Sequence, residues 1–141
     1  MTLAERALER LRIWPDLRTG RASCGTGSAL RAGRSEIVHF HSAHEVDLHL
    51  TDRALDRFGL DLAESTAIRL VPGSRWVTVH LDCDTDVDLL MSLVSMALKA
   101  HQAPQAETTD VCNFRRVTVI PSAPPARPGG GRGSSPRTGG R

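Results

Sequence analysis

Residues 36–50 read EIVHFHSAHEVDLHL, which is two alternating segments joined by the polar sequence SAHE. Successive side chains of a β-strand point to opposite faces, so the alternation predicts an antiparallel hairpin made of residues 36–41 and 45–50. One face of this hairpin is wholly apolar and consists of Val38, Phe40, Val46, Leu48 and Leu50. That face is therefore expected to lie in the core.

The sequence on either side of the hairpin predicts the other elements. Thr2 and Glu5 form a capping box for a helix that ends at Trp14-Pro15, and residues 16–27 are expected to be loop. The elements that follow are a short strand at 29–31, the hairpin, a helix at about 52–63, strands at 67–71 and 75–81, and a helix at about 86–100.

The resulting order of elements, α-βββ-α-ββ-α, predicts the fold class. Strands that follow one another through short turns pair antiparallel, and helices then cover one face of the sheet. The sequence therefore predicts an α+β two-layer sandwich with an antiparallel five-stranded sheet and helices on one face. The other face of the sheet is expected to contact solvent.

The chain of 141 residues has room for one domain, expected at residues 1–120, and a tail at 121–141. Residues 122–141 are mainly Gly, Pro, Ser and Arg, a composition typical of disorder. Of 18 basic and 16 acidic side chains, four arginines and no acid lie in this tail, so the remainder carries about −2. Two interpretations of the tail stay open. One is weak contact with nucleic-acid phosphates; the other, favoured by the lack of interleaved aromatic residues, is a solvated tail.

Two further features of the sequence indicate the cellular compartment of the protein. No apolar run is as long as a membrane span, and the charged N-terminal segment lacks a secretion signal, so a cytoplasmic protein without membrane contact is expected. The three cysteines, Cys24, Cys83 and Cys112, are far apart and odd in number, which argues against a disulfide framework. They are interpreted as buried or idle thiols.

The second face of the predicted sheet is mostly polar. It is expected to carry Ile37, His39, His41, Glu45, Asp47, His49, Arg69, Trp76, Thr78 and His80. The histidines thus share one face of one sheet with carboxylates, an arginine and an indole.

Three interpretations of this polar face stay open. In the first, it is the solvent side of a half-exposed sheet. In the second, it is a transition-metal site formed by His39, His41 and His49 with Asp47, since cross-strand Cβ atoms lie about 4.5–5.5 Å apart. In the third interpretation it binds an unidentified ligand or protein partner, which an exposed Trp76 would favour. The residues of that binding surface are His39, His41, Asp47, His49, Arg69, Trp76 and His80.

Other motifs match known binding or catalytic patterns only in part. DCDTDVD at residues 82–88 has alternating acids but lacks the Gly and Glu of a calcium-binding loop, so its acids are interpreted as stabilising a helix start. CGTGSAL at residues 24–30 lacks the third glycine of a dinucleotide fingerprint and is expected to be a loop that passes close to other backbone. Cys24 in that loop could act as a nucleophile, but no base is assigned to it. No cofactor-binding motif is recognised.

The segments SCGTGSALRAGRSEIVHFHSAHEVDLHLT (23–51) and STAIRLVPGSRWVTVHLDCDTDVDLLMSLVSMALKAHQ (65–102) resemble the luciferase-domain family of small actinobacterial proteins. The resemblance covers about residues 3–120, and His39, His41 and His49 stand where that family has histidine-bearing strands. It implies a small α+β domain and no defined reaction. The chain is too short for the (β/α)₈ barrel of flavin-dependent luciferases, which needs about 200 residues or more.

A looser resemblance links RWVTVHLDCDTDVDLLMSLVSMAL (75–98) to the double-wing DNA-binding family. It implies a nucleic-acid-binding regulatory module, against which the slightly acidic body argues. The sequence therefore favours a binding module that uses the His-rich face over an enzyme. The alternatives are a metal-dependent enzyme using His39, His41 and His49, and the nucleic-acid module.

Overall fold

The computed structural model describes residues 1–102 and 111–114. Its elements in chain order are α1 (Leu3–Leu11), β1 (Arg18–Arg21), β2 (Ser28–Ala32), β3 (Ser35–Phe40), β4 (Glu45–His49), α2 (Thr51–Ala63), β5 (Ile68–Leu70), β6 (Trp76–His80) and α3 (Asp84–Gln102). The tail expected at residues 121–141 lies outside the described residues.

The strands form one antiparallel sheet in the order β1-β2-β3-β4-β6-β5. The α+β class and the antiparallel sheet are confirmed, but the prediction of five strands is wrong because β1 adds a sixth. This strand, RTGR, was predicted to be loop because it has no apolar residue, and all four of its residues are exposed. It is an edge strand that pairs with β2 through backbone hydrogen bonds, a contact that side-chain patterns do not reveal.

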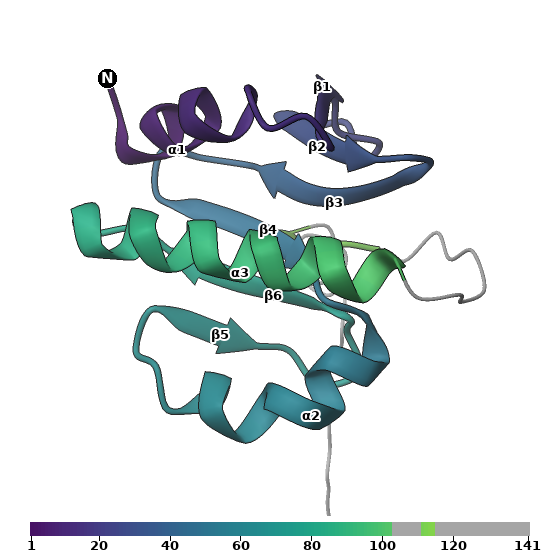
Figure 1. Cartoon of the computed structure of the whole chain (residues 1–141). Coiled ribbons are helices and arrows are strands. Elements are labelled where there is room, and N and C mark those ends of the chain that lie inside the picture. Colours follow the sequence, from purple (N-terminus) through teal and green to yellow (C-terminus); the bar gives the residue numbers. More distant parts are fainter. Residues whose placement is uncertain (103–110, 115–141) are drawn as a thin grey trace, which may run out of the picture.

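The three helices lie on one face of the sheet, with α3 between α1 and α2 (Figure 1). The predicted capping box of α1 is confirmed, since Thr2 Oγ1 accepts a hydrogen bond from Glu5 N and Thr2 N donates to Glu5 Oε2. Val38 and Leu48 pair across β3 and β4 and are fully buried, as are Leu90 and Val94 of α3. The core therefore lies between the helices and the face predicted to be apolar.

A β-bulge in β3 interrupts the predicted alternation. Leu30 pairs with Val38, but Arg31 pairs with Glu36, so Ile37 is an extra residue without a partner on β2. Ile37 was expected on the polar face; instead it is fully buried and belongs to the core cluster. Because the bulge shifts the phase by one residue, Glu36 now shares a face with His39, where their side chains meet.

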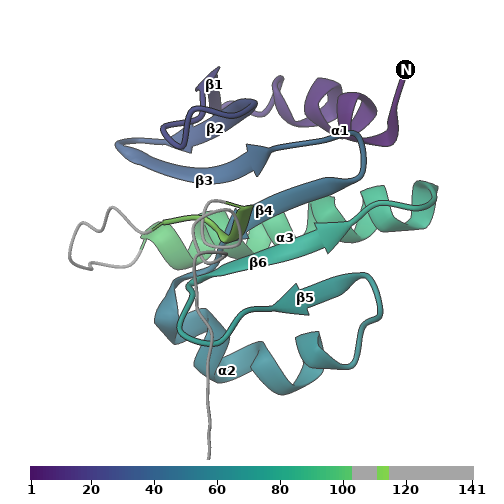
Figure 2. The same ribbon diagram turned by 180° about the vertical axis from the view of Figure 1, so that it is seen from behind.

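The polar face is not open to solvent at its centre, contrary to the prediction. Residues 111–114 lie on the side of the sheet opposite the helices, in front of β4 and β6 (Figure 2). The buried polar-face residues are His39, Asp47, His49, Trp76 and Thr78, each at most 5% exposed. The predicted alternation is correct for β4 and β6. However, residues 111–114, which follow β6 by more than 30 residues, cover the outer face of both strands. Both faces of the central strands are therefore buried.

Candidate metal centre

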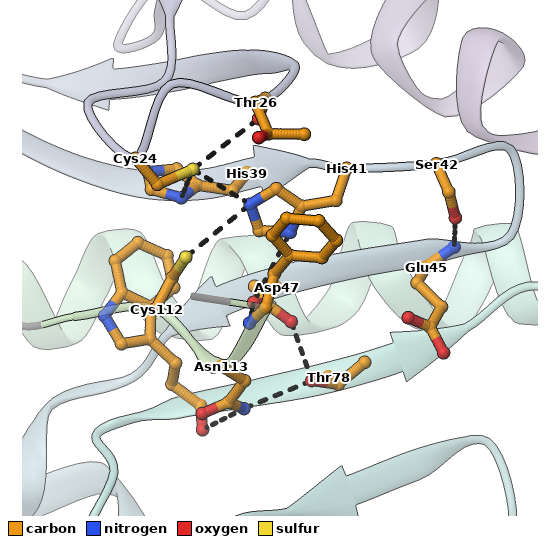
Figure 3. A network of polar contacts seen from close by, with 12 residues as sticks. Cys24, Thr26, His39, His41, Ser42, Glu45, Asp47, Thr78, Cys112 and Asn113 are labelled. Carbon is orange, nitrogen blue, oxygen red and sulfur yellow. Dashed lines mark hydrogen bonds and ion pairs between the residues drawn. The ribbon is translucent and has the colours of Figure 1, made fainter. Parts of the chain in front are cut away.

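Two histidines and two cysteines meet on the covered face of the sheet (Figure 3). Cys24 comes from the loop between β1 and β2, His39 from β3, His41 from the residue after β3, and Cys112 from the segment after α3. One ligand atom from each of these four side chains lies within 4.8 Å of the other three. We call this group the Cys2His2 cluster.

The separations within the Cys2His2 cluster fit tetrahedral coordination of zinc. Cys24 Sγ lies 3.3 Å from His41 Nε2 and 3.8 Å from His39 Nδ1, and Cys112 Sγ lies 3.6 Å from His41 Nε2. Bond lengths of about 2.3 Å to sulfur and about 2.0–2.1 Å to nitrogen place S and N about 3.6 Å apart around one tetrahedral zinc ion. The four donors therefore surround a volume that suits such an ion.

The loop that carries Cys24 lies directly against the end of β3. Gly25 N donates to Ala22 O at 3.0 Å and Ala22 N donates to Gly27 O at 3.1 Å, which closes the loop. A Cβ atom built on Gly27 would lie 1.9 Å from Phe40 O. This contact confirms the prediction that the loop passes close to other backbone, and it brings Cys24 beside the two histidines.

Cys112 is held in place by its neighbour Asn113, which is fully buried. The Asn113 amide donates to Trp76 O at 2.8 Å and to Thr78 Oγ1 at 3.1 Å, and it accepts a hydrogen bond from Ser74 Oγ at 2.6 Å. These bonds fix the segment to β6 and its preceding turn, so the Cys112 thiol faces His41.

A carboxylate supports each histidine on the side away from the cysteines. His39 Nε2 lies 2.7 Å from Glu36 Oε1, and His41 Nδ1 lies 3.5 Å from Asp47 Oδ2. Carboxylates paired in this way with ligating histidines fix the ring orientation and the proton position. With its proton on Nε2, which faces Glu36, His39 would direct the Nδ1 lone pair towards Cys24 Sγ, and His41 protonated on Nδ1 would do the same with Nε2.

Asp47 is itself fixed, and so it acts as a support and not as a ligand in this geometry. Its Oδ1 accepts a hydrogen bond from Thr78 Oγ1 at 2.6 Å, and its Oδ2 accepts one from Phe114 N at 2.9 Å. The Phe114 ring stacks on the His41 imidazole with centroids 4.5 Å apart. Asp47 thus links β4, β6 and the segment after α3 beneath His41.

Burial keeps both histidines of the cluster in the neutral form that binds metal. Desolvation lowers the pKa of His41 to about 4, although the Asp47 carboxylate opposes this change. Desolvation also lowers the pKa of His39. For Glu36, burial raises the pKa, but hydrogen bonds from Ser23 N and His39 outweigh it, so the pKa falls below its usual value. At neutral pH the site therefore presents two neutral imidazoles, and Glu36 behind His39 is a carboxylate.

Comparison with known families identifies the domain. Residues 34–97 match the family model of the Luciferase domain. The chain therefore contains a Luciferase domain, within residues 34–97. No curated protein and no solved structure matches it.

The matched region of the Luciferase-domain protein contains His39, His41 and both supporting carboxylates, but neither Cys24 nor Cys112. The two thiols are therefore contributed by segments on either side of the match. Their separation along the chain leaves no CxxC spacing, which is why sequence reasoning did not connect them with the histidines. Glu36 was missed for a different reason, because the bulge that turns it towards His39 was not predicted.

The other predicted site residues of the Luciferase-domain protein lie outside the cluster. His49 is buried, but its Nδ1 lies 3.0 Å from Nε2 of His101. Burial, together with His49, lowers the pKa of His101. Trp76 was expected to be exposed, yet it is buried between His39 and His49, with centroids 4.5 and 5.2 Å from theirs. Its indole therefore packs against the imidazoles and offers no open contact surface.

Two predicted binding residues stay at the exposed edge of the sheet. His80 and Arg69 have side chains that are 47% and 55% exposed, and both approach Glu45, at 3.9 and 3.8 Å. The structure does not bring them to the Cys2His2 cluster. No helix in the described part of the Luciferase-domain protein is both long and apolar enough to cross a bilayer.

The His41 pKa predicts how the stability of metal-free Luciferase-domain protein depends on pH. His41 titrates near 6.5 when unfolded and at about 4 when folded, so between these values the unfolded chain binds more protons. The free energy of unfolding should therefore fall as the pH drops from about 6.5 towards 4, and His41 should contribute no change above about 6.5. Urea denaturation of chelator-treated protein at a series of pH values measures this.

The control for this pH dependence is His80→Gln, which changes an exposed histidine. His41→Gln should flatten the pH dependence between about 4 and 6.5, while His80→Gln should leave it as it is in the unsubstituted protein. An unchanged slope in His41→Gln would show that this imidazole is not kept neutral by burial.

Proposed function

We propose that this Luciferase-domain protein binds one zinc ion at Cys24, His39, His41 and Cys112. The convergence of two thiols and two imidazoles at tetrahedral spacing supports this proposal most directly. A donor set of two sulfurs and two nitrogens in tetrahedral geometry is typical of zinc. The carboxylates behind both rings are a second, independent feature of such sites.

The geometry favours a structural zinc over a catalytic one. Catalytic zinc keeps one coordination position for water or substrate, whereas four protein ligands close the tetrahedron. The site is also shielded, since the His41 side chain is 2% exposed and Cys112 is 2% exposed. This argues against the metal-dependent enzyme considered from the sequence, in which three histidines would leave a position open.

The bound zinc ion would connect two peripheral segments to the central strands of the sheet. The sheet and the helices enclose a continuous apolar core, so we expect the central domain to fold without metal. The β1–β2 loop and residues 111–114, by contrast, contribute one ligand each. The proposed role of the zinc is therefore to hold these two segments on the outer face of the sheet.

Metal analysis of the purified full-length chain tests this function. We expect one zinc per chain, and we expect exchange with Co²⁺ to give the intense visible absorption of tetrahedral cobalt with thiolate-to-metal charge transfer. Cys83→Ala, which removes the exposed cysteine outside the cluster, should behave identically. Protein that contains no zinc and gives no tetrahedral cobalt spectrum would refute the proposal.

Glu36 is expected to tune the affinity of this centre. Glu36→Gln replaces a carboxylate by a weaker acceptor of nearly the same shape at His39 Nε2, so His39 should become a poorer ligand. Losses of about 10–100-fold in metal affinity are usual for such supporting residues. Competition with a chromogenic chelator measures the change. The matched control is Glu45→Gln at the exposed edge of the sheet, which should keep the affinity of the unsubstituted protein; equal affinities of the two variants would exclude this role for Glu36.

A further inference from the structure

The two sulfurs of the Cys2His2 cluster differ in their access to solvent. Cys24 is half-buried, whereas Cys112 is 2% exposed. Their Sγ atoms lie within 4.8 Å of each other. A zinc ion between them would hold both as thiolates about 3.8 Å apart. Two close thiolates of unequal access are the arrangement in which one sulfur is oxidised first and the other resolves the product.

We propose that Cys24 and Cys112 form a peroxide-sensitive switch in which their oxidation to a disulfide releases the zinc ion. The inference rests on the proposed zinc centre and describes how zinc binding there is regulated. The oxidant is a hydroperoxide, with hydrogen peroxide as its simplest member.

The reaction takes place in two steps. The Cys24 thiolate attacks one peroxide oxygen, the O–O bond breaks, and Cys24 becomes a sulfenic acid while hydroxide leaves. The Cys112 thiolate then attacks the Cys24 sulfur, an S–S bond forms, and the sulfenic oxygen leaves as a second hydroxide. The two sulfurs together lose two electrons, which reduce the peroxide. Zinc then retains only His39 and His41, two ligands in place of four, and it dissociates.

The loop geometry permits the required movement. Disulfide formation brings the sulfurs to about 2.05 Å, so they must approach by up to a few ångströms. Cys24 stands in a loop outside any helix or strand, next to Gly25. Cys112 is fixed by Asn113 on the sheet. The Cys24 loop is therefore the partner that moves.

The closing experiment uses the zinc-loaded full-length chain with Cys83→Ala, so that only the two cluster thiols remain. Zinc content is measured first. Hydrogen peroxide is then titrated, released zinc is read with a chromogenic chelator, and disulfides are mapped by mass spectrometry. We expect one zinc released per Cys24–Cys112 disulfide, and zinc binding restored by a dithiol reductant and added zinc. A second variant, Cys112→Ser, lacks the resolving thiol and is tested without bound zinc; peroxide should leave sulfenic acid on its Cys24 that a dimedone-type reagent traps.

The outcomes separate the two proposals. Absence of zinc before peroxide would overturn the zinc centre and the switch with it. Zinc that is present at the start and stays bound, with both thiols still open to alkylation after denaturation, would overturn the switch alone. Dimedone labelling on Cys112 in a Cys24→Ser variant, and not on Cys24 in Cys112→Ser, would overturn the assigned order of attack.

Discussion

Replacing Cys112 with alanine is expected to abolish stoichiometric zinc binding and to remove the stabilisation that zinc gives. Among the residues that the structure describes, Cys112 is the one ligand supplied after α3, and without it three donors remain on the sheet and the β1–β2 loop. A ligand that binds only the folded state stabilises it by about 4 kcal/mol when its free concentration is 1,000-fold above Kd. This difference should be present in the unsubstituted protein and absent in Cys112→Ala.

Urea denaturation with saturating zinc and with chelator measures that difference for each variant. Cys83→Ala serves as the matched control, because it also removes one thiol but lies outside the cluster and is exposed. It should keep the full zinc-dependent increase in the free energy of unfolding. An equal zinc-dependent increase in Cys112→Ala would mean that the ion binds elsewhere.

Gly27→Ala is expected to destabilise the protein by about 3 kcal/mol or more and to weaken zinc binding. The φ angle of Gly27 is +84°, and an added Cβ would lie 1.9 Å from Phe40 O, which is backbone and cannot rotate away. The loop would have to move off the end of β3. Since Cys24 precedes Gly27 by three residues, its thiol would leave the cluster.

Gly25→Ala separates backbone conformation from this clash. Gly25 has nearly the same φ, +86°, but a Cβ there meets nothing within 4 Å. Gly25→Ala should lower the free energy of unfolding only by the cost of the left-handed conformation, about 1–2 kcal/mol. Its zinc affinity should stay close to that of the unsubstituted protein. Thermal denaturation and chelator competition on both variants test the prediction, and equal losses in the two would contradict it.

The sequence predicts the parts of this fold that depend on side-chain alternation. The apolar set on β3 and β4 lies in the core as expected. Two features that do not depend on alternation were missed. β1 pairs through its backbone while its side chains are polar, and the bulge at Ile37 shifts the phase of β3 within a segment that looks regular.

The candidate site could be predicted only in part, because half of it comes from distant segments. His39 and His41 were singled out as an H-x-H pair on one face of a strand. Cys24 and Cys112 could not be added, since their approach depends on where a loop and a segment after α3 dock, and each docks through contacts that leave no periodic pattern. Trp76 and His49, which the pattern placed in solvent, are buried as well.

X-ray absorption at the zinc K-edge of the purified protein tests the central claim most directly, because it reports which atoms surround the metal. The Cys2His2 assignment predicts a first shell of two sulfurs at about 2.3 Å and two nitrogens at about 2.0–2.1 Å. A first shell of nitrogen and oxygen alone, or one with a single sulfur, would contradict it.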